Sequence, residues 1–332
     1  MKKCYFYWDR FDPISVIDCE IISTLLLENE EVILVVDEEG QESLEHRLKM
    51  INILLSEFKF ENLVRVISES ELSKFDFVDK EIKVVGDKTI DDLKKAFSGL
   101  EVNFELLQKP FIGFELTESN FNINKLVGLE FLSINLIDYI SENHLYYIKP
   151  LIGLLSPHRL SHSISVAKTA FNIIEANYLN KEERCFKEGL LPLDGYRAGI
   201  IHDIGKSLPI EKQKELMEKY HKEYVDYPTW TYHQFIAEEL TKKFYIVTNK
   251  IIEGVKYHST GSDTMSLLGE IIYASDKIEP TRDYDSSYMI NRCQDSFDKS
   301  FPFVVKEVKE FLESKGMIID NELSEKFFNK YL

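Results

Sequence analysis

The sequence contains few cysteines and no long apolar run, and each shortage excludes a class of protein. Its four cysteines (Cys4, Cys19, Cys185 and Cys293) are widely spaced and include no Cys-x-x-Cys pair, so we expect free thiols in a reducing compartment. No stretch approaches the roughly 20 apolar residues needed to cross a bilayer. The first residues lack the apolar core and the small-residue cleavage site of a secretory signal. We therefore expect a cytoplasmic protein with no membrane partner.

Positive charge is also scarce. Forty Lys and Arg face 57 Asp and Glu, which gives a formal net charge of −17. This balance argues against general nucleic-acid binding, because phosphate contacts need a basic face. It leaves a phosphate substrate open, because bound metals and a few converging basic side chains can reverse the local potential. Apolar residues are plentiful, at 44% of the chain, so 332 residues suffice for two domains with full cores.

The first half of the chain alternates short apolar runs with segments of helical periodicity. We expect strands at 3–8, 31–36, 63–67, 82–85 and 102–107, and helices at 14–28, 42–58 and 91–97. Strands that alternate with helices predict a parallel sheet joined by right-handed crossovers. The sequence therefore predicts a Rossmann-like α/β domain over residues 1–148.

Beyond Lys149 and Pro150 the strand signals stop and helical patterns take over. We expect helices at 158–176, 196–202, 210–220, 232–244, 247–257 and 267–278, a turn at 189–194, and a core-covering apolar stripe over 301–312. The second domain, residues 149–332, is thus predicted to be all-helical. The fold class is α/β followed by all-α.

Residues that can bind metals recur through this second half in short motifs. An apolar run ends in an adjacent His-Asp pair, and two later motifs are Tyr-His-Ser-Thr-Gly at 257–261 and Ala-Ser-Asp-Lys-Ile-Glu-Pro-Thr-Arg at 274–282. The candidate ligands are His162, His202, Asp203, His233, His258 and Asp276. A set of imidazoles and carboxylates of this kind suits one or two transition-metal ions.

With these motifs, the segment from about Leu151 onward resembles the metal-dependent phosphohydrolases of the HD superfamily. The motifs at 257–261 and 274–282 narrow the resemblance to the bacterial YqeK-type branch, the symmetrical diadenosine tetraphosphate hydrolases. Two positions depart from that pattern. Gly205 stands where the family more often has Ala, and Gln234 where it usually has Gly, but neither position donates a ligand.

The resemblance implies a hydrolase that cleaves diadenosine tetraphosphate into two ADP by means of a metal-activated hydroxide. It implies two divalent ions, with Asp203 bridging them and Asp276 completing the first ion's ligands. His233 and His258 are assigned to the second ion, the alternative being that they bind substrate phosphates. Iron is the metal that the resemblance favours, with manganese and zinc as alternatives.

Basic residues beside the motifs are candidates for catalysis and phosphate binding. Arg159 and Arg282 can bind phosphate oxygens with two donors each, and Lys206 can act as a point charge. Thr260 and Gly261 are expected to shape the floor where the substrate enters.

Several alternatives stay open for the second domain. Glu279 can orient a metal-bound histidine or cap a helix. The enzyme can instead be another HD phosphohydrolase, acting on a nucleoside triphosphate, a cyclic dinucleotide or an alarmone. The expected partner is a dinucleoside polyphosphate or another nucleotide, and a homodimer is left open.

The first domain resembles the nicotinate-mononucleotide adenylyltransferases. Phe-Asp-Pro-Ile at 11–14 directly follows the first predicted strand, as in that family's signature, although an ordinary turn after a strand is the alternative. Further fragments agree in order, at 84–87, 114–120 and 136–146. Ser15 and Asp18 replace the two signature histidines, and Asn120 replaces the family's Arg. Because these residues stabilise the leaving pyrophosphate, we expect a catalytically inactive, degenerate domain, with nucleotide sensing left open.

Overall fold

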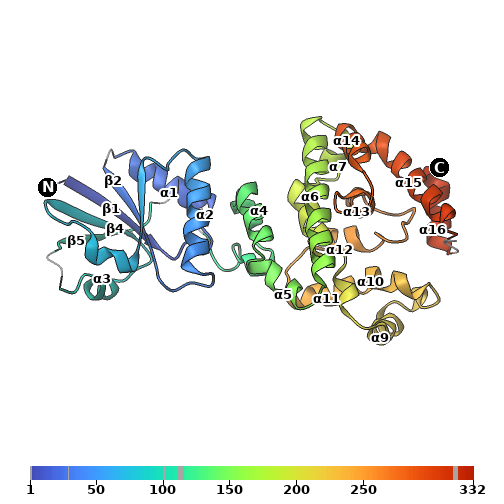
Figure 1. Ribbon diagram of the computed structural model, residues 1–332, viewed down its shortest axis with the longest axis horizontal. Coiled ribbons are helices and arrows are strands. Elements are labelled where there is room, and N and C mark those ends of the chain that lie inside the picture. The colour runs from blue at the N-terminus through green and yellow to red at the C-terminus, as the bar shows by residue number, and fades with distance from the viewer. Residues whose placement is uncertain (1, 29, 100–101, 111–115, 317–320) are drawn as a thin grey trace. The chain divides into compact units, whose positions relative to one another are not determined.

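A computed structural model of the chain describes residues 2–28, 30–99, 102–110, 116–316 and 321–332. Residues 114 and 115 of the predicted fragment 114–120 lie outside this range. The chain forms two compact units, one of residues 1–123 and 128–146 and the other of 124–127 and 147–332. Residues 124–127 group with the second unit because the carbonyl oxygen of Lys125 accepts a hydrogen bond from Ile246 N at 3.0 Å. Figure 1 labels the elements along the chain.

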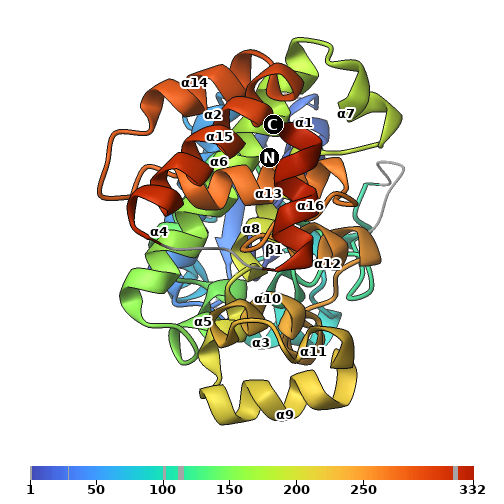
Figure 2. The ribbon, with the colours of Figure 1, turned by 90° about the vertical axis from the view of Figure 1, so that its right-hand side faces the viewer.

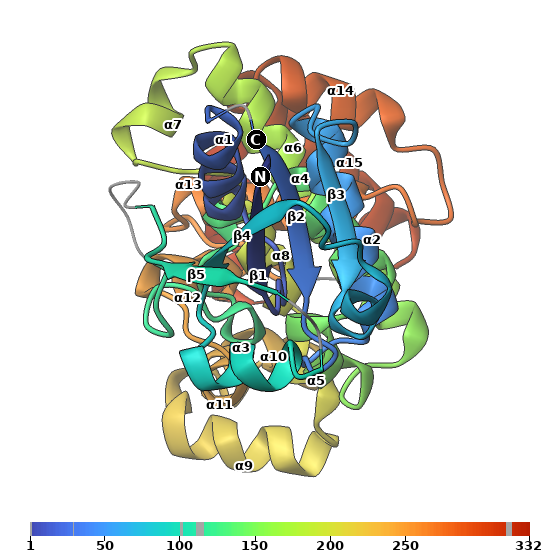
Figure 3. The ribbon, with the colours of Figure 1, turned by 90° about the vertical axis from the view of Figure 1, so that its left-hand side faces the viewer.

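The first unit is built on a parallel sheet, as predicted. Its described strands are β1 (Lys2–Asp9), β2 (Glu31–Val36), β3 (Val64–Ser68), β4 (Lys80–Gly86) and β5 (Phe104–Leu107). They lie in the order β3-β2-β1-β4-β5, and every described neighbouring pair is parallel (Figure 3). The helices of the unit are α1 (Val16–Leu26), α2 (Leu44–Glu57), α3 (Ile90–Ala96) and α4 (Ile134–Glu142), with 3-10 turns η1 (Glu69–Lys74) and η3 (Leu129–Phe131). The 3-10 turn η2 (Ile123–Lys125) begins in this unit and continues into the residues that group with the second. The Rossmann-like prediction is confirmed.

Side chains of β1 alternate between the two faces of this sheet. Cys4, Phe6 and Trp8 pack in one apolar cluster, whereas the hydroxyl of Tyr7 donates to Asp18 on α1. Because both faces of the sheet are covered, the sequences of its strands are nearly continuous runs of apolar residues. The chain order reverses between β1 and β4, and the carboxyl ends of neighbouring strands meet at one edge of the sheet, where ligands bind in open α/β folds.

The helices and 3-10 turns of the second unit are its regular elements, and none of its described residues belongs to a strand of the sheet (Figure 2). Its helices are α5 (Lys149–Ile152), α6 (Pro157–Leu179), α7 (Glu183–Lys187), α8 (Pro192–Ile201), α9 (Ile210–Tyr220), α10 (Tyr232–Phe235), α11 (Ala237–Phe244), α12 (Asn249–Val255), α13 (Leu267–Ile278), α14 (Ser287–Asp295), α15 (Phe297–Ser314) and α16 (Glu322–Tyr331). Short 3-10 turns are η4 (Tyr146–Ile148), η5 (Ile204–Ser207), η6 (Lys222–Tyr224) and η7 (Thr229–Thr231). Among the described helices, none combines the length and apolarity that a membrane span requires. The four cysteines are free, as predicted.

Two local predictions were wrong. The segment 232–244 is not one helix, because the chain turns at Ile236 (φ −84°, ψ 2°) between α10 and α11. The predicted turn at 189–194 is shorter, because α8 already begins at Pro192. Proline suits the first helical turn, and the Asp194 carboxylate accepts from Leu191 N at 3.0 Å. Helices α7, α14 and α16 were not predicted.

Helices α6, α8 and α13 pack against one another at the centre of the unit. Ser156 caps α6 by accepting from Arg159 N, and Pro157 occupies its first turn. Every residue of α13 except Lys277 is buried. Helix α8 approaches α6 closely because Gly199 has no side chain: a Cβ there would lie 2.4 Å from Ala167 Cα.

We therefore predict that Gly199→Ala lowers the free energy of unfolding by about 1–3 kcal/mol, because the added methyl forces α8 away from α6. Urea unfolding measures the change. Gly153→Ala is the matched control, since a Cβ at Gly153 meets nothing within 4 Å. Equal stability of the two variants would contradict the close packing of these helices.

Candidate metal centre

The six predicted ligand residues converge within the second unit, and each is at most 7% exposed. They are His162 on α6, His202 and Asp203 between α8 and η5, His233 on α10, His258 in the turn after α12, and Asp276 on α13. Two groups share Asp203: His162, His202 and Asp203, and Asp203, His233 and His258. In each group the potential ligand atoms lie within 4.8 Å of one another.

One oxygen, Asp203 Oδ1, lies at the centre of these residues. It is 3.4 Å from Nε2 of His233, 3.4 Å from Nε2 of His258 and 3.6 Å from Nε2 of His202. The other oxygen, Oδ2, accepts a hydrogen bond from Lys206 Nζ at 2.8 Å. The two oxygens of this carboxylate therefore have separate roles, one binding a lysine and one facing three imidazoles.

Three histidines repeat one hydrogen-bond pattern. The Nδ1 atoms of His202, His233 and His258 each lie 2.7–2.9 Å from the main-chain carbonyl oxygen three residues earlier. A carbonyl oxygen can only accept, so the ring proton of each neutral imidazole resides on Nδ1 and its Nε2 carries a lone pair. Metal-binding histidines are commonly oriented in this way.

The fourth histidine, His162, lies between two carboxylates. Its Nδ1 is 2.9 Å from Glu279 Oε1, and its Nε2 is 3.0 Å from Asp276 Oδ1. Asp276 Oδ1 also lies 3.7 Å from His202 Nε2, which joins this pair to the first group. Glu279, whose role the sequence left open, both contacts His162 and ends α13 as its C-terminal cap residue.

The electrostatics of the site keep its carboxylates charged and two of its imidazoles neutral. Burial alone would raise the pKa of Asp203, but nearby positive charge, including that of Lys206 at 2.8 Å, holds it well below its ordinary value. Burial would also raise the pKa of Asp276, but Lys277 and His162 have the larger effect and hold that pKa well below its ordinary value. Burial lowers the pKa of His233 and of His258, which leaves both rings neutral near pH 7.

These atoms fit a cation. His202 Nε2 and Asp203 Oδ1 are buried without any hydrogen-bond partner. His233 Nε2 and His258 Nε2 lie 3.0 Å apart, with lone pairs on both rings, and the Ser259 hydroxyl at 3.1 Å can donate only to the former. Unpaired buried acceptors cost free energy, and a positive charge among them offsets that cost. The donor set of imidazoles and carboxylates therefore can hold divalent metal.

Gly205 allows the segment that follows Asp203 to touch α10. A Cβ at this position would lie 2.1 Å from the carbonyl oxygen of His233, so alanine would force the two segments apart. Glycine at 205, one of the two departures from the resemblance, thus permits the approach of His233 to Asp203.

The predicted phosphate-binding residues occupy different surroundings. Arg159 is exposed, and its Nη1 donates to the carbonyl oxygen of Lys206 at 3.2 Å. Arg282 is partly exposed, and its Nη2 donates to Asp276 Oδ1 at 2.7 Å. Lys277, which the sequence argument did not single out, donates from Nζ to Asp276 Oδ2 at 2.7 Å. Its position directly after Asp276 in the motif is the sequence feature that could have identified Lys277 as a functional residue.

Thr260 and Gly261 are buried behind the site. The Thr260 hydroxyl accepts from Gln234 Nε2 at 3.1 Å, and Gly261 has a left-handed φ of 71° and packs against Phe327. Gln234, the second departure from the resemblance, was also not singled out as a functional residue. It lies directly beside His233 in the sequence, which was the signal for it.

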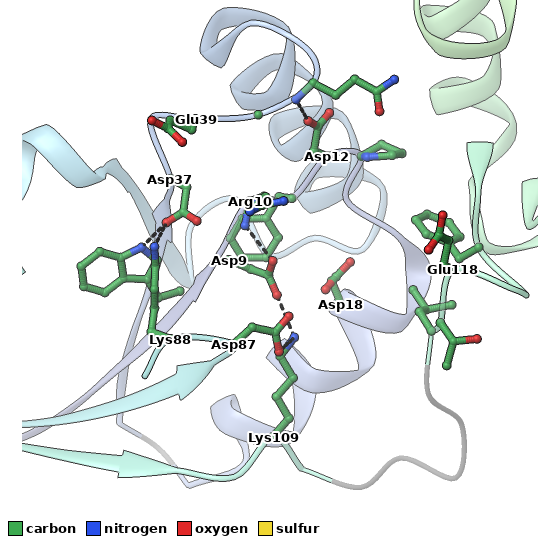
Figure 4. A pocket seen from close by; sticks show the side chains of 18 of the residues that line it. Asp9, Arg10, Asp12, Asp18, Asp37, Glu39, Asp87, Lys88, Lys109 and Glu118 are labelled. Atoms are coloured by element: carbon green, nitrogen blue, oxygen red, sulfur yellow. Dashed lines mark hydrogen bonds and ion pairs between the residues drawn. The ribbon is translucent and has the colours of Figure 1, made fainter. Parts of the chain in front are cut away.

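The first unit has a cavity of about 1040 Å³ at the carboxyl edge of its sheet (Figure 4). The described residues that line it include eight carboxylates and three basic side chains. Two of the bases are neutralised in place: Lys109 lies 2.7 Å from Asp9 and 2.9 Å from Asp87, and Lys88 lies 2.7 Å from Asp37. This lining is unfavourable to a nucleotide phosphate.

The N-terminus of α1, where a phosphate would bind in such a fold, is occupied by a carboxylate of the protein itself. Ser15 caps the helix, and Asp18 Oδ2 accepts from Ser15 N at 2.8 Å and from Ser15 Oγ at 2.7 Å. Desolvation by burial raises the pKa of Asp18. Asp12 is likewise engaged, accepting from Glu42 N at 3.2 Å and from the Tyr146 hydroxyl.

One family model and several known proteins match part of the chain. Residues 159–281 match the family model for the HD domain, so the second unit contains an HD domain. The chain is 29% identical over 153 residues (46% of this chain, 40% of the relative) to a protein of Mycoplasma genitalium named probable nicotinate-nucleotide adenylyltransferase/Ap4A hydrolase. It is 28% identical over 131 residues (39% and 64%) to the symmetrical bis(5'-nucleosyl)-tetraphosphatase of Bacillus subtilis. The matches thus cover less than two thirds of either relative.

Among solved structures, the chain is similar to a predicted HD superfamily hydrolase involved in NAD metabolism from Clostridium acetobutylicum. The identity is 22%, the TM-score is 0.44, and the match covers 59% of this chain and 96% of that one.

We predict that the first unit does not transfer a nucleotidyl group. Incubation with ATP, Mg²⁺ and nicotinate mononucleotide should release no pyrophosphate, because the lining carboxylates and the Asp18 cap oppose phosphate binding. Asp18→Asn removes one charge without supplying a donor for the leaving group, and should be equally inactive. Pyrophosphate release that depends on the mononucleotide would contradict this prediction.

Proposed function

We propose that this chain hydrolyses diadenosine tetraphosphate symmetrically, giving two ADP, in a catalytic domain formed by residues 149–332. The observation that carries the proposal is the convergence of three imidazole Nε2 atoms on Asp203 Oδ1, where His202 Nε2 and Asp203 Oδ1 are buried without a hydrogen-bond partner. The HD-domain match and the names of the relatives support the reaction class. Residues 1–148 are proposed to be a degenerate nucleotidyltransferase domain.

Two divalent ions are proposed to occupy the site. The first would be held by His162, His202, Asp203 and Asp276, and the second by Asp203, His233 and His258. Iron is the proposed metal, with manganese or zinc as alternatives. Bound ions of this kind lower the pKa of a water and offset phosphate charge, which supplies the nucleophile for hydrolysis.

The residues of the chain would prepare the site for this chemistry. The carbonyl bonds to Nδ1 of His202, His233 and His258 keep the Nε2 lone pairs of these three rings directed at Asp203, so none of the three has to lose a proton from Nε2 to bind an ion. Asp203 would be a ligand of both ions, while Lys206 restrains its Oδ2. Burial excludes bulk water from the ligands and strengthens each electrostatic interaction there.

The basic residues at the edge of the site are proposed to hold the polyphosphate. Arg159 and Lys206 lie side by side, because the guanidinium donates to the carbonyl oxygen of Lys206. Arg282 approaches from the segment after α13 and is bonded to Asp276. Lys206 and Arg282, which contact separate ligand residues, would hold several phosphates of one chain, and the reacting phosphorus would then lie inside that chain rather than at its end. Thr260 and Gly261 would support this surface from behind.

We predict that Asp203→Ala or His202→Ala lowers the hydrolysis rate by roughly a thousandfold or more, since loss of a metal ligand removes several kcal/mol of barrier reduction. The thermal unfolding curve should remain cooperative. His221→Ala is the matched control, because His221 is a buried histidine of the same unit that contacts Glu239 at 3.2 Å. An Asp203→Ala variant with a near-normal rate would disprove the assignment.

The position of bond cleavage is a separate prediction. Hydrolysis of diadenosine tetraphosphate in water labelled with heavy oxygen should give ADP as the only early product, with label on half of the molecules. Mass spectrometry of the products measures this. Early ATP and AMP would show cleavage of an outer phosphoanhydride bond, and would reject the symmetrical reaction while leaving the metal site in place.

A further inference from the structure

A single buried side chain, Gln234, joins the two segments that carry the second pair of histidines. It is 1% exposed and follows His233 directly on α10. Its Oε1 accepts from Ser259 N at 2.9 Å and from Thr260 N at 3.3 Å, and its Nε2 donates to Thr260 Oγ1 at 3.1 Å. These bonds reach the turn that directly follows His258. Its first residue, Ser259, lies 25 residues after Gln234 in the chain.

The two histidines need to be held together, because their facing atoms repel. His233 Nε2 and His258 Nε2 are 3.0 Å apart, and each is 3.4 Å from the charged oxygen of Asp203. Without a cation, the turn and α10 would separate unless other contacts oppose the repulsion. The Gln234 amide supplies three hydrogen bonds across this gap, in a buried place where water does not compete for them.

Each of the two segments is also fixed on its outer side. The carbonyl oxygen of His233 lies against Gly205, and the carbonyl oxygen of Thr260 accepts from Ser324 Oγ on α16 at 2.9 Å. These contacts hold α10 to η5 and hold the turn to the C-terminal helix. The three Gln234 bonds cross the space between α10 and the turn, together with the contact of the Ser259 hydroxyl with His233 Nε2 at 3.1 Å, and they help to set the spacing of the two Nε2 atoms.

Gln234 is not itself a ligand in this arrangement. Its oxygen is directed at two main-chain N–H groups and its nitrogen at a hydroxyl, so each polar atom of the amide is already used. It can act on a metal only through the positions of His233 and His258. Glycine, which the resembling family usually has here, could make none of these bonds.

We propose that Gln234 is a positioning residue for the metal site formed by Asp203, His233 and His258, setting the affinity of that site and not of the site formed with His162 and His202. This inference rests on the two-metal site of the proposed function. Loss of outer contacts of this kind commonly weakens metal binding by roughly 10–100-fold.

The test is a Mn²⁺ titration of the metal-free full chain by calorimetry, with electron paramagnetic resonance to detect spin coupling between two bound ions. Gln234→Met preserves the length of the side chain and removes its hydrogen bonds. We expect the second Mn²⁺ to bind roughly 10–100-fold more weakly and the coupled signal to fall, with the first site unchanged. Gln234→Glu keeps an acceptor for both main-chain N–H groups and should recover most of the affinity.

Gln213→Met is the matched control. Gln213 is a buried glutamine of the same unit whose Nε2 donates to a main-chain carbonyl oxygen, that of Leu208, at 2.9 Å. It should bind both ions as the unchanged protein does, which separates positioning from a general loss of stability. If Gln234→Met does not fold, Thr260→Val, which removes one bond of the network, takes its place, with a smaller weakening expected at the second site only.

The outcomes separate this inference from the proposed function. If the unchanged protein binds no second ion, the two-metal proposal fails and the inference fails with it. If the unchanged protein binds two coupled ions and the Gln234→Met or Thr260→Val variant binds both as tightly, the inference is overturned and the proposed function stands. Equal weakening of both sites would also overturn it, because a structural defect would then explain the result.

Discussion

The second unit depends on one electrostatic constraint: several lone pairs and one carboxylate oxygen are held together in a buried place. Asp203 Oδ1 faces Nε2 of three histidines, and it has no hydrogen-bond partner of its own. Such an arrangement is unfavourable by itself, so the packing of α6, α8 and α13 has to maintain it. These unpaired acceptors lower the stability of the fold, and the same arrangement forms a binding site for a cation.

The constraint is met by short-range contacts repeated at separate places in the chain. Three imidazoles are oriented by the carbonyl oxygen three residues before each of them, a contact that a helix end or tight turn supplies without help from elsewhere. Gly199 and Gly205 then remove the side-chain bulk that would keep the segments apart. Local geometry thus aims each ligand, and close packing brings the aimed ligands together.

In the first unit, several carboxylates that line the cavity are paired with basic side chains. Its cavity also collects carboxylates at the ends of strands, but Lys109 and Lys88 neutralise Asp9, Asp87 and Asp37, and Asp18 is bonded to Ser15. Acidic groups that are already paired leave little to attract a ligand cation, and they oppose a phosphate. The metal site of the second unit differs because Asp203 Oδ1 has no hydrogen-bond partner and faces imidazole lone pairs, although Lys206 binds the other oxygen of the same carboxylate.

Much of the architecture was determined by sequence alone, because the signals for it are local. The strand at 31–36 and the helices at 210–220 and 267–278 were predicted with the observed bounds, since periodicity and caps act within a few residues. The identities of the six candidate ligands also came from short motifs. Tertiary structure alone decided that Glu279 contacts His162, 117 residues away, that Gln234 joins α10 to the turn after His258, and that the chain breaks at Ile236. These depend on contacts between distant segments, for which neither periodicity nor motif spacing carries a signal, because only the packed helices bring the partners within hydrogen-bond distance.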